Sequence, residues 1–219
     1  INKYLALHKY STRRGADELI KAGKVTINGK KAQLGDQVGE SDTVVVDVKT
    51  ISKLQEQYVY YAYNKSVGVE THAIKIEHCF PVGRLDQASH GLIIITNDGR
   101  VTDRLLNPEY DHEKEYVVRV NKPISENFIT RMGKGVKIED GITRPAVVDA
   151  EPFSKTFHIT LTEGKKHQIR RMATALGYEV VDLERVRVMN VELGHLKSGQ
   201  FRKLAGAELS GFLRGIGLL

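Results

Sequence analysis

Hydrophobic and polar residues alternate with two different periods along the first quarter of the chain. Apolar positions three and four residues apart come first and indicate two short amphipathic helices. The second helix begins after the capping residue Ser11 and ends at Gly23. The predicted elements are helices over 2–8 and 11–23, strands over 25–27 and 42–48, and a hairpin turn at Asn28-Gly29. Residues 1–49 are therefore predicted to form a compact unit of two helices and a small antiparallel sheet.

Strand patterns dominate the rest of the chain. The polar stretch 50–57 lacks strand periodicity and is interpreted as a linker, so a second domain is predicted over 58–219. Its predicted strands lie at 58–63, 92–96, 114–120, 136–138, 146–150, 156–162, 180–184 and 186–193, and its predicted helices at 101–106, 125–132, 165–176 and 208–213. Because strands and helices do not alternate regularly, the pattern favours an α+β fold with a mixed or antiparallel sheet.

The charge balance of the chain favours a polyanionic partner. The 219 residues include 33 Lys and Arg against 27 Asp and Glu, which gives a formal net charge of +6. Half of the excess lies in residues 1–49, where nine basic residues stand against six acidic ones. Arg13 and Arg14 open the second helix, where cations oppose the helix dipole, so phosphate contact explains them better than helix stability does. A solvated basic face is the alternative.

Several classes of protein are excluded or disfavoured by what the sequence lacks. The single Cys79 excludes an internal disulfide and a multi-cysteine zinc site, and a lone thiol is typical of a reducing compartment. No apolar run approaches the roughly 18 residues that a membrane span needs, so the expected location is the cytoplasm. Phosphate-binding glycine loops and a nucleophile-elbow serine are also missing. We expect no cofactor and no metal ion, because His167 has no further ligands at metal-binding spacing.

The stretch from Gly83 to Gly91 concentrates the candidate chemistry. Arg84 and Asp86 lie two residues apart, which places both side chains on one face of an extended backbone, and the buried strand 92–95 follows directly. The two glycines allow close approach of another backbone or of a ligand. A guanidinium beside a carboxylate keeps it ionised and fixed in place. Taken alone, the segment is equally consistent with an ion pair that stabilises a loop.

Two other segments carry candidate binding groups. Tyr116 lies on a predicted strand, on the face opposite Glu115, and is either a core residue or a platform on which a base stacks. The predicted helix from 165 places cations near its start, where an external anion is their natural partner, and one arginine of this helix could instead turn inward to Asp86. The basic residues of this helix are Lys165, Lys166, His167, Arg170 and Arg171. A further candidate is Lys65, which is expected to be exposed in the turn after the strand 58–63.

Together these segments resemble the rRNA pseudouridine synthases of the RsuA class over almost the whole chain. The matching motifs are Gly83-Arg84-Leu85-Asp86 with Ser89 and Gly91-Leu92, Lys114-Glu115-Tyr116, and Gln168-Ile169-Arg170-Arg171-Met172. The resemblance implies that Asp86 is the catalytic residue, that Tyr116 packs on the target base and that Arg170 pairs with Asp86. Residues 1–49 are similar to the RNA-binding module of small-subunit ribosomal protein S-four, and 111–116 look most like the large-subunit RluF type.

The activity that the resemblance implies is isomerisation of a uridine in ribosomal RNA to pseudouridine, without a cofactor. Asp86 would act either as nucleophile at C1′ or as base at C2′, and Arg84 would fill the space that the flipped nucleotide leaves. The implied RNA-binding residues are Arg13, Arg14, Lys65, Arg84, Lys165, Lys166, His167 and Arg171. We expect a monomer that acts on ribosomal RNA, free or within an assembling subunit. Two alternatives stay open, namely a non-catalytic rRNA-binding assembly factor and a nucleoside hydrolase, which usually needs two carboxylates.

Overall fold

The computed structural model describes residues 1–8, 10–11, 13–39, 41–47 and 58–219. The side chains of Leu7, Arg13 and Arg14 are not among the described parts, and the predicted linker 50–57 also lies outside them. Two units are described, one on either side of this segment.

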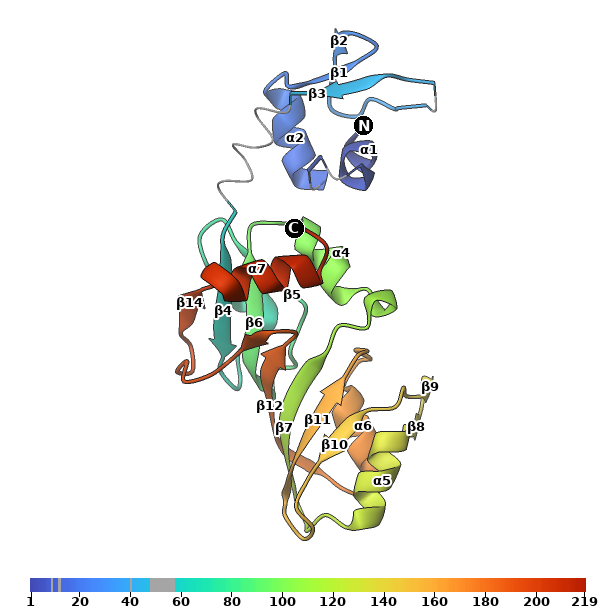
Figure 1. Ribbon diagram of the computed structural model, residues 1–219, viewed down its shortest axis with the longest axis vertical. Coiled ribbons are helices and arrows are strands. Elements are labelled where there is room, and N and C mark those ends of the chain that lie inside the picture. The colour runs from blue at the N-terminus through green and yellow to red at the C-terminus, as the bar shows by residue number, and fades with distance from the viewer. Residues whose placement is uncertain (9, 12, 40, 48–57) are drawn as a thin grey trace.

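The N-terminal unit, blue in Figure 1, contains two helices and a three-stranded antiparallel sheet. Its elements are α1 (Asn2–Leu7), α2 (Arg13–Lys21), β1 (Val25–Ile27), β2 (Lys30–Lys31) and β3 (Val44–Val46). Asn28 and Gly29 both have positive φ angles, 51° and 79°, which is the geometry of a hairpin turn that Asn-Gly favours. Apolar residues of both helices and of β1 and β3 form one buried cluster, so this unit has its own core.

The larger unit is built on a mixed sheet of nine strands. The path of the sheet runs β10-β11-β7-β12-β6-β4-β14, with β13 paired to β12 and β5 paired to β6. The strands are β4 (Tyr60–Lys65), β5 (Phe80–Val82), β6 (His90–Thr96), β7 (Lys114–Val120), β10 (Val147–Asp149), β11 (Thr156–Leu161), β12 (Val180–Val188), β13 (Val191–Glu192) and β14 (Phe201–Lys203). Within the described residues, β6 and β12 form the one parallel pair.

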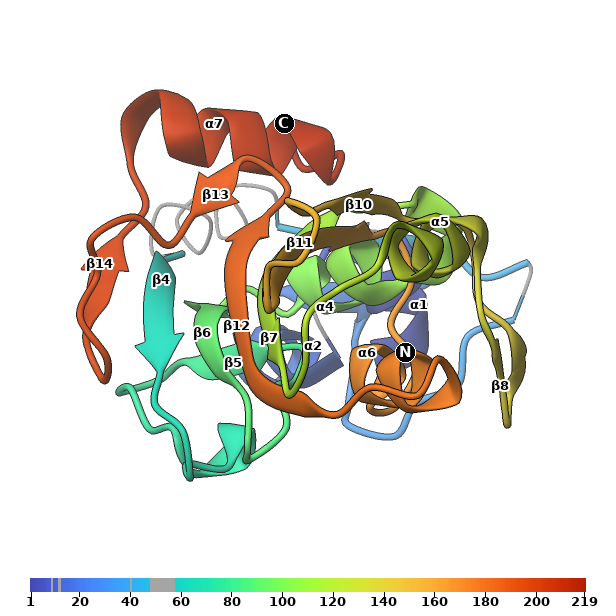
Figure 2. The same cartoon turned by 90° about the horizontal axis from the view of Figure 1, so that it is seen from below.

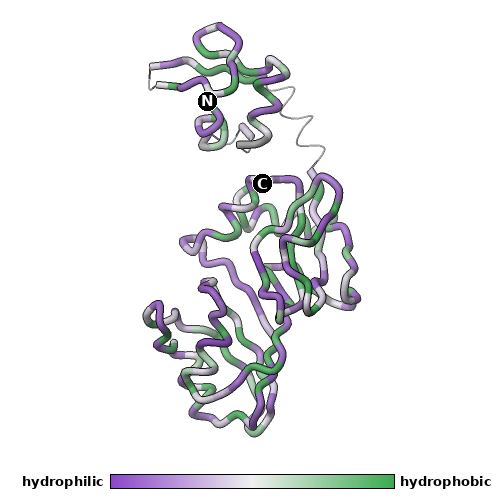
Figure 3. The backbone as a smooth tube through the Cα atoms, turned by 180° about the vertical axis from the view of Figure 1, so that it is seen from behind, coloured by the Kyte–Doolittle hydropathy of each residue, from purple (hydrophilic) through white to green (hydrophobic). Residues whose placement is uncertain are grey.

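Helices cover this sheet in two groups, each with its own core (Figures 1 and 2). One core joins β7, β10, β11 and β12 to α5 (Glu126–Lys134) and α6 (Gln168–Ala175). The other joins β4, β6 and the end of β12 to α4 (Arg100–Leu106) and α7 (Gly206–Gly215). Figure 3 shows the apolar stretches along the strands. The two halves of the sheet therefore meet at the β6–β12 pair.

Short elements complete the larger unit. Two 3-10 turns, Thr71–Ala73 and Pro108–Tyr110, lie in the loops after β4 and α4. The hairpin of β8 (Lys137–Ile138) and β9 (Gly141–Ile142) follows α5. None of the helices in the described ranges is long and apolar enough to span a lipid bilayer.

The predicted α+β architecture with a small N-terminal unit is confirmed, and two of its details are wrong. The strands predicted at 180–184 and 186–193 are one long strand, β12, followed by the short β13. The helix predicted from 165 begins only at Gln168, because His167 has a left-handed φ of 51° that a helix does not admit. Lys166 and His167 therefore lie in the turn before the helix and do not share its faces with Arg170 and Arg171, contrary to the prediction that one helix carries these cations near its start.

Candidate active site

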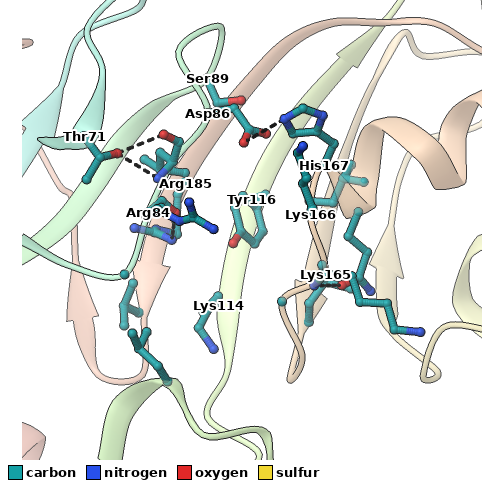
Figure 4. A pocket seen from close by; sticks show the side chains of 18 of the residues that line it. Thr71, Arg84, Asp86, Ser89, Lys114, Tyr116, Lys165, Lys166, His167 and Arg185 are labelled. Carbon is teal, nitrogen blue, oxygen red and sulfur yellow. Dashed lines mark hydrogen bonds and ion pairs between the residues drawn. The ribbon is translucent and has the colours of Figure 1, made fainter. Parts of the chain in front are cut away.

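A cavity of about 870 Å³ opens where β6, β7 and β12 lie side by side. Its lining includes Asp86 from the loop before β6, Tyr116 from β7, Arg185 from β12, and the turn that leads into α6. Figure 4 shows these side chains gathered around one open space. Segments about a hundred residues apart in the sequence thus contribute to one site, which we call the central cavity.

The loop that carries Asp86 is held by hydrogen bonds on both sides. The Thr71 hydroxyl donates to the Leu85 carbonyl oxygen at 2.9 Å and accepts from the Leu85 amide at 3.0 Å. The Gly68 amide donates to the Gln87 carbonyl at 2.8 Å, and the Ser89 amide donates to that of Asp86 at 2.9 Å. These bonds hold the backbone that carries Asp86 in place, which is what a candidate catalytic group requires.

Lys65 belongs to the support of this loop and not to the RNA-binding surface. Its side chain is fully buried, and its ammonium group donates to the carbonyl oxygens of Ser66, Val69 and Gln87 at 2.9, 2.6 and 3.5 Å. Burial lowers the pKa of Lys65, and the nearby charge of Asp86 opposes that shift. The prediction that Lys65 binds RNA is wrong, because the strand end turns inward under the loop.

The predicted ion pair between Arg170 and Asp86 does not form either. The Arg170 guanidinium donates to the Ala88 carbonyl at 3.0 Å, to the Ser89 hydroxyl at 3.4 Å and to the Val180 carbonyl at 2.9 Å. It thus ties the Asp86 loop to the start of β12. Arg170 acts on the candidate catalytic residue through the backbone that carries it.

The basic side chain that faces Asp86 is His167. Its Nε2 lies 3.3 Å from Asp86 Oδ1, while the Arg84 side chain is exposed and makes no ion pair with Asp86 among the described residues. The Asp86 side chain is 36% exposed and that of His167 is 49% exposed, so both are open to solvent. The alternative that Asp86 only stabilises a loop through an Arg84 pair therefore loses its support.

Tyr116 lies on the cavity face of β7, as the strand pattern predicted. It is partly buried between two apolar clusters and lines the cavity with its ring. Its neighbour Glu115 points to the other face, where it accepts from Arg187 at 2.8 Å and lies 3.3 Å from His158. The hydrogen bond from Arg187 lowers the pKa of Glu115. A large aromatic surface is thus presented to the cavity by a strand that is anchored on its reverse face.

Gly91 is required by the close approach of β12 to β6. Its φ is 101°, and a Cβ added to it would lie 2.3 Å from the carbonyl oxygen of Arg185. No L-amino acid side chain fits there without separating the two strands. The prediction that a glycine at this point allows close backbone approach is confirmed.

Two cavity residues were missed as candidates from the sequence. Lys114, on β7, donates from its ammonium group to the His112 carbonyl at 3.0 Å. Arg185, on β12, is only 5% exposed and donates to the Leu92 carbonyl at 2.7 Å. Burial, and after it the charge of Arg185, lower the pKa of Lys114. The signal for Lys114 in the sequence is a cation on the same strand face as Tyr116, whereas Arg185 falls between two predicted strands and has no such signal.

The remaining predicted RNA-binding residues have different environments. Lys166 and Arg84 are exposed at the cavity. Lys165 also lines it, and its ammonium group donates to the carbonyl of Ile142 at 3.3 Å. Arg171 is paired with Asp140 at 2.5 Å and with Glu139 at 3.7 Å, so acidic side chains already compensate its positive charge. The predictions for Arg13 and Arg14 concern side chains outside the described ones.

The arrangement of carboxylates bears on the hydrolase alternative. Glu163 also lines the cavity, but its Oε1 accepts from the Gln168 side chain at 2.6 Å and from the Arg144 amide at 3.0 Å. It is therefore occupied, and Glu70, the other glutamate of the lining, lies 3.0 Å from His72. The described part of the cavity thus offers Asp86 no unpartnered second carboxylate of the kind that a glycosidase uses. In the described ranges, no three His, Cys, Asp or Glu side chains form a group that could hold a metal ion.

A partly exposed aspartate and a partly buried tyrosine that line one cavity rich in basic side chains fit an enzyme that acts on a nucleotide. The chain belongs to the RNA pseudouridylate synthase family, whose model matches residues 59–175, and an S4 domain matches residues 1–44.

Relatives agree with this assignment over nearly the full chain. The chain is 42% identical to the dual-specificity RNA pseudouridine synthase RluF of Salmonella typhi, covering 95% of this chain and 76% of the relative. It is 32% identical to the ribosomal large subunit pseudouridine synthase B of Bacillus subtilis, covering 95% and 93%. A crystal structure of a pseudouridylate synthase superposes with a TM-score of 0.70 at 26% identity, covering 96% and 98%. The prediction of an RNA pseudouridine synthase that resembles the RluF type is confirmed.

Proposed function

We propose that this synthase converts one specific uridine of large-subunit ribosomal RNA to pseudouridine, with Asp86 as the catalytic group. The observation that carries the proposal is the Asp86 carboxylate, which is fixed through its backbone and yet 36% exposed to a cavity that Tyr116 also lines. The names of the relatives, RluF and ribosomal large subunit pseudouridine synthase B, support the choice of RNA.

The reaction breaks the bond between the sugar and N1 of uracil, turns the base and joins C5 to the same sugar carbon. Asp86 serves it as nucleophile at C1′ or as base at C2′. The nucleotide must first leave its stack, at a cost of a few kcal/mol. Stacking on Tyr116 offsets this cost, since a base on an aromatic side chain gains about 1–3 kcal/mol. The exposed Arg84 side chain takes the place that the base vacates.

The bound RNA runs over cations at the cavity and over the N-terminal unit. At the cavity these are Arg84, Lys166 and His167, which are exposed, and Lys165 beside them. In the N-terminal unit they are Arg13 and Arg14. We place the domain boundaries at 49 and 58, and we propose a monomer that acts in the cytoplasm on ribosomal RNA, free or within an assembling subunit.

The proposal is tested by mapping pseudouridines in rRNA from cells that lack this protein and from cells that express a variant in its place. We expect one or a few positions in large-subunit rRNA to lose the modification and to regain it with the native chain or with Asp149→Asn, an exposed carboxylate on the edge strand β10. Asp86→Asn should not restore it. Unchanged rRNA would instead favour the non-catalytic assembly factor.

A further inference from the structure

Two cations in the central cavity have no acidic partner. Lys114 and Arg185 both line it, and no carboxylate among the described residues lies within the 4.0 Å of an ion pair from either side chain. Their hydrogen bonds go to backbone carbonyl oxygens, from Lys114 to His112 and from Arg185 to Leu92 and Arg84. Arg100 of the same unit is paired with Asp98 at 2.7 Å, whereas Lys65 and Arg170 are held by carbonyl and hydroxyl oxygens.

Strand register places both cations beside the tyrosine that faces the base. Arg185 on β12 is the direct cross-strand partner of Tyr116 on β7, so the two side chains share a face. Lys114 precedes Tyr116 by two residues and therefore lies on the same face, roughly 7 Å further along the strand. In Figure 4, Tyr116 lies between the Asp86–His167 pair and Lys114. Lys114 thus lies on the side of the tyrosine that is remote from the candidate catalytic carboxylate, and Arg185 lies beside the tyrosine, where it reaches the Arg84 carbonyl.

Keeping two like charges together in a partly buried site is unfavourable. Burial penalises each charge, and the charge of Arg185 further lowers the pKa of Lys114. Lys65 is also buried among carbonyl oxygens, but the nearby charge of Asp86 opposes the lowering of its pKa, whereas the charge near Lys114 is a second cation. An anion that binds to both cations would compensate their charges and so remove this unfavourable free energy. The cavity is open to such an anion from solvent.

We infer that Lys114 and Arg185 form a subsite for one backbone phosphate of the RNA, next to the flipped uridine. The inference rests on the proposed function and deepens it. A phosphate fits better than a carbonyl oxygen of uracil, because a neutral acceptor would leave both positive charges uncompensated. The subsite would fix the sugar from its phosphate side while Tyr116 holds the base, so that Asp86 meets the sugar carbon in one orientation.

The salt dependence of RNA binding tests this subsite. The full chain is titrated with a ten-nucleotide uridine oligomer at a series of salt concentrations, as native protein and as Lys114→Gln, which removes the charge and keeps most of the length. Loss of one phosphate contact on a single strand should reduce the slope of log affinity against log salt by about 0.7, so that between 50 and 200 mM salt the native protein loses about 2.6-fold more affinity than the variant. Lys114→Arg should keep the native slope.

A matched control is Lys155→Gln, an exposed lysine outside the cavity, which should leave the slope unchanged. Equal thermal unfolding of the variants shows that each is folded. A native slope in Lys114→Gln would overturn the inference, and so would weaker binding without a change of slope, since that result assigns Lys114 to a neutral group of uracil. A drop of the same size in Lys155→Gln would also overturn it.

The test does not depend on turnover. If the native chain forms no pseudouridine in any rRNA, the proposed function fails, whereas the slope on the uridine oligomer still reports whether Lys114 contacts a phosphate. If the chain forms pseudouridine and Lys114→Gln keeps the native slope, only the subsite fails.

Discussion

Asp86 depends on residues that make no contact with its carboxylate. Thr71, Lys65 and Arg170 bind the backbone of residues 85–89 and leave the side chain free toward the cavity. The motif around Asp86 was enough to single it out, and the alternation of β7 was enough to orient Tyr116. The partners of Lys65 and Arg170 could not be predicted from the sequence. Most of them are carbonyl oxygens of loops, and the position of these loops depends on how distant strands pack.

At this scale, Gly91→Ala should be strongly destabilising. The new methyl group would lie 2.3 Å from the Arg185 carbonyl, and the residue would have to keep a φ of 101°. We expect a loss of more than about 1 kcal/mol in the free energy of unfolding, measured by urea denaturation. The control is Gly164→Ala, where a Cβ meets nothing within 4 Å. Equal stability of the two variants would contradict the assigned packing of β6 on β12.

At the scale of elements, β7 shows how one strand serves the site and the fold with opposite faces. Tyr116 and Lys114 face the cavity, while Glu115 binds Arg187 of the neighbouring strand on the reverse face. The sequence pattern predicted a strand over 114–120, which are the bounds that β7 has in the structure. It did not predict that residues 180–188 form one strand, because the register shifts against β7 interrupt the alternation.

The Glu115 contact should make stability depend on pH in the acidic range. Arg187 lowers the pKa of Glu115 from its ordinary value of 4.5. The stabilisation is therefore complete above that value and is lost as the pH falls through the lowered pKa of the folded state. Between about pH 6 and pH 3 we expect the free energy of unfolding of the native protein to fall by up to about 1 kcal/mol more than that of Glu115→Gln. The difference stays small because the pair is partly exposed to solvent. Parallel curves of unfolding free energy against pH would contradict this.

At the scale of the whole molecule, the division into a small basic unit and a larger catalytic one follows from composition and pattern. Both units have separate cores, and the separate family matches to 1–44 and 59–175 agree with that division. What the sequence alone could not supply is the cavity, which forms only when β6, β7 and β12 meet. For the same reason Arg185 was missed, and it also falls between the strands predicted at 180–184 and 186–193.

The N-terminal unit should supply RNA affinity that is independent of sequence. Arg13→Ala combined with Arg14→Ala removes two expected phosphate contacts, so the slope of log affinity against log salt should fall by about 1.8 on duplex rRNA. A filter-binding titration measures it, with Lys137→Ala and Lys155→Ala, two exposed lysines of the larger unit, as the matched pair. A native slope in the arginine variant would remove these two residues from the RNA-binding surface.

Release of tritium from rRNA labelled at C5 of uridine tests most directly whether Asp86 catalyses the isomerisation. The new bond to C5 expels the hydrogen there. The native chain should release tritium and Asp86→Asn should not, while Asp149→Asn should behave like the native chain. Release by Asp86→Asn at the native rate would contradict the account, and so would free uracil as the product or the absence of release from every precursor rRNA.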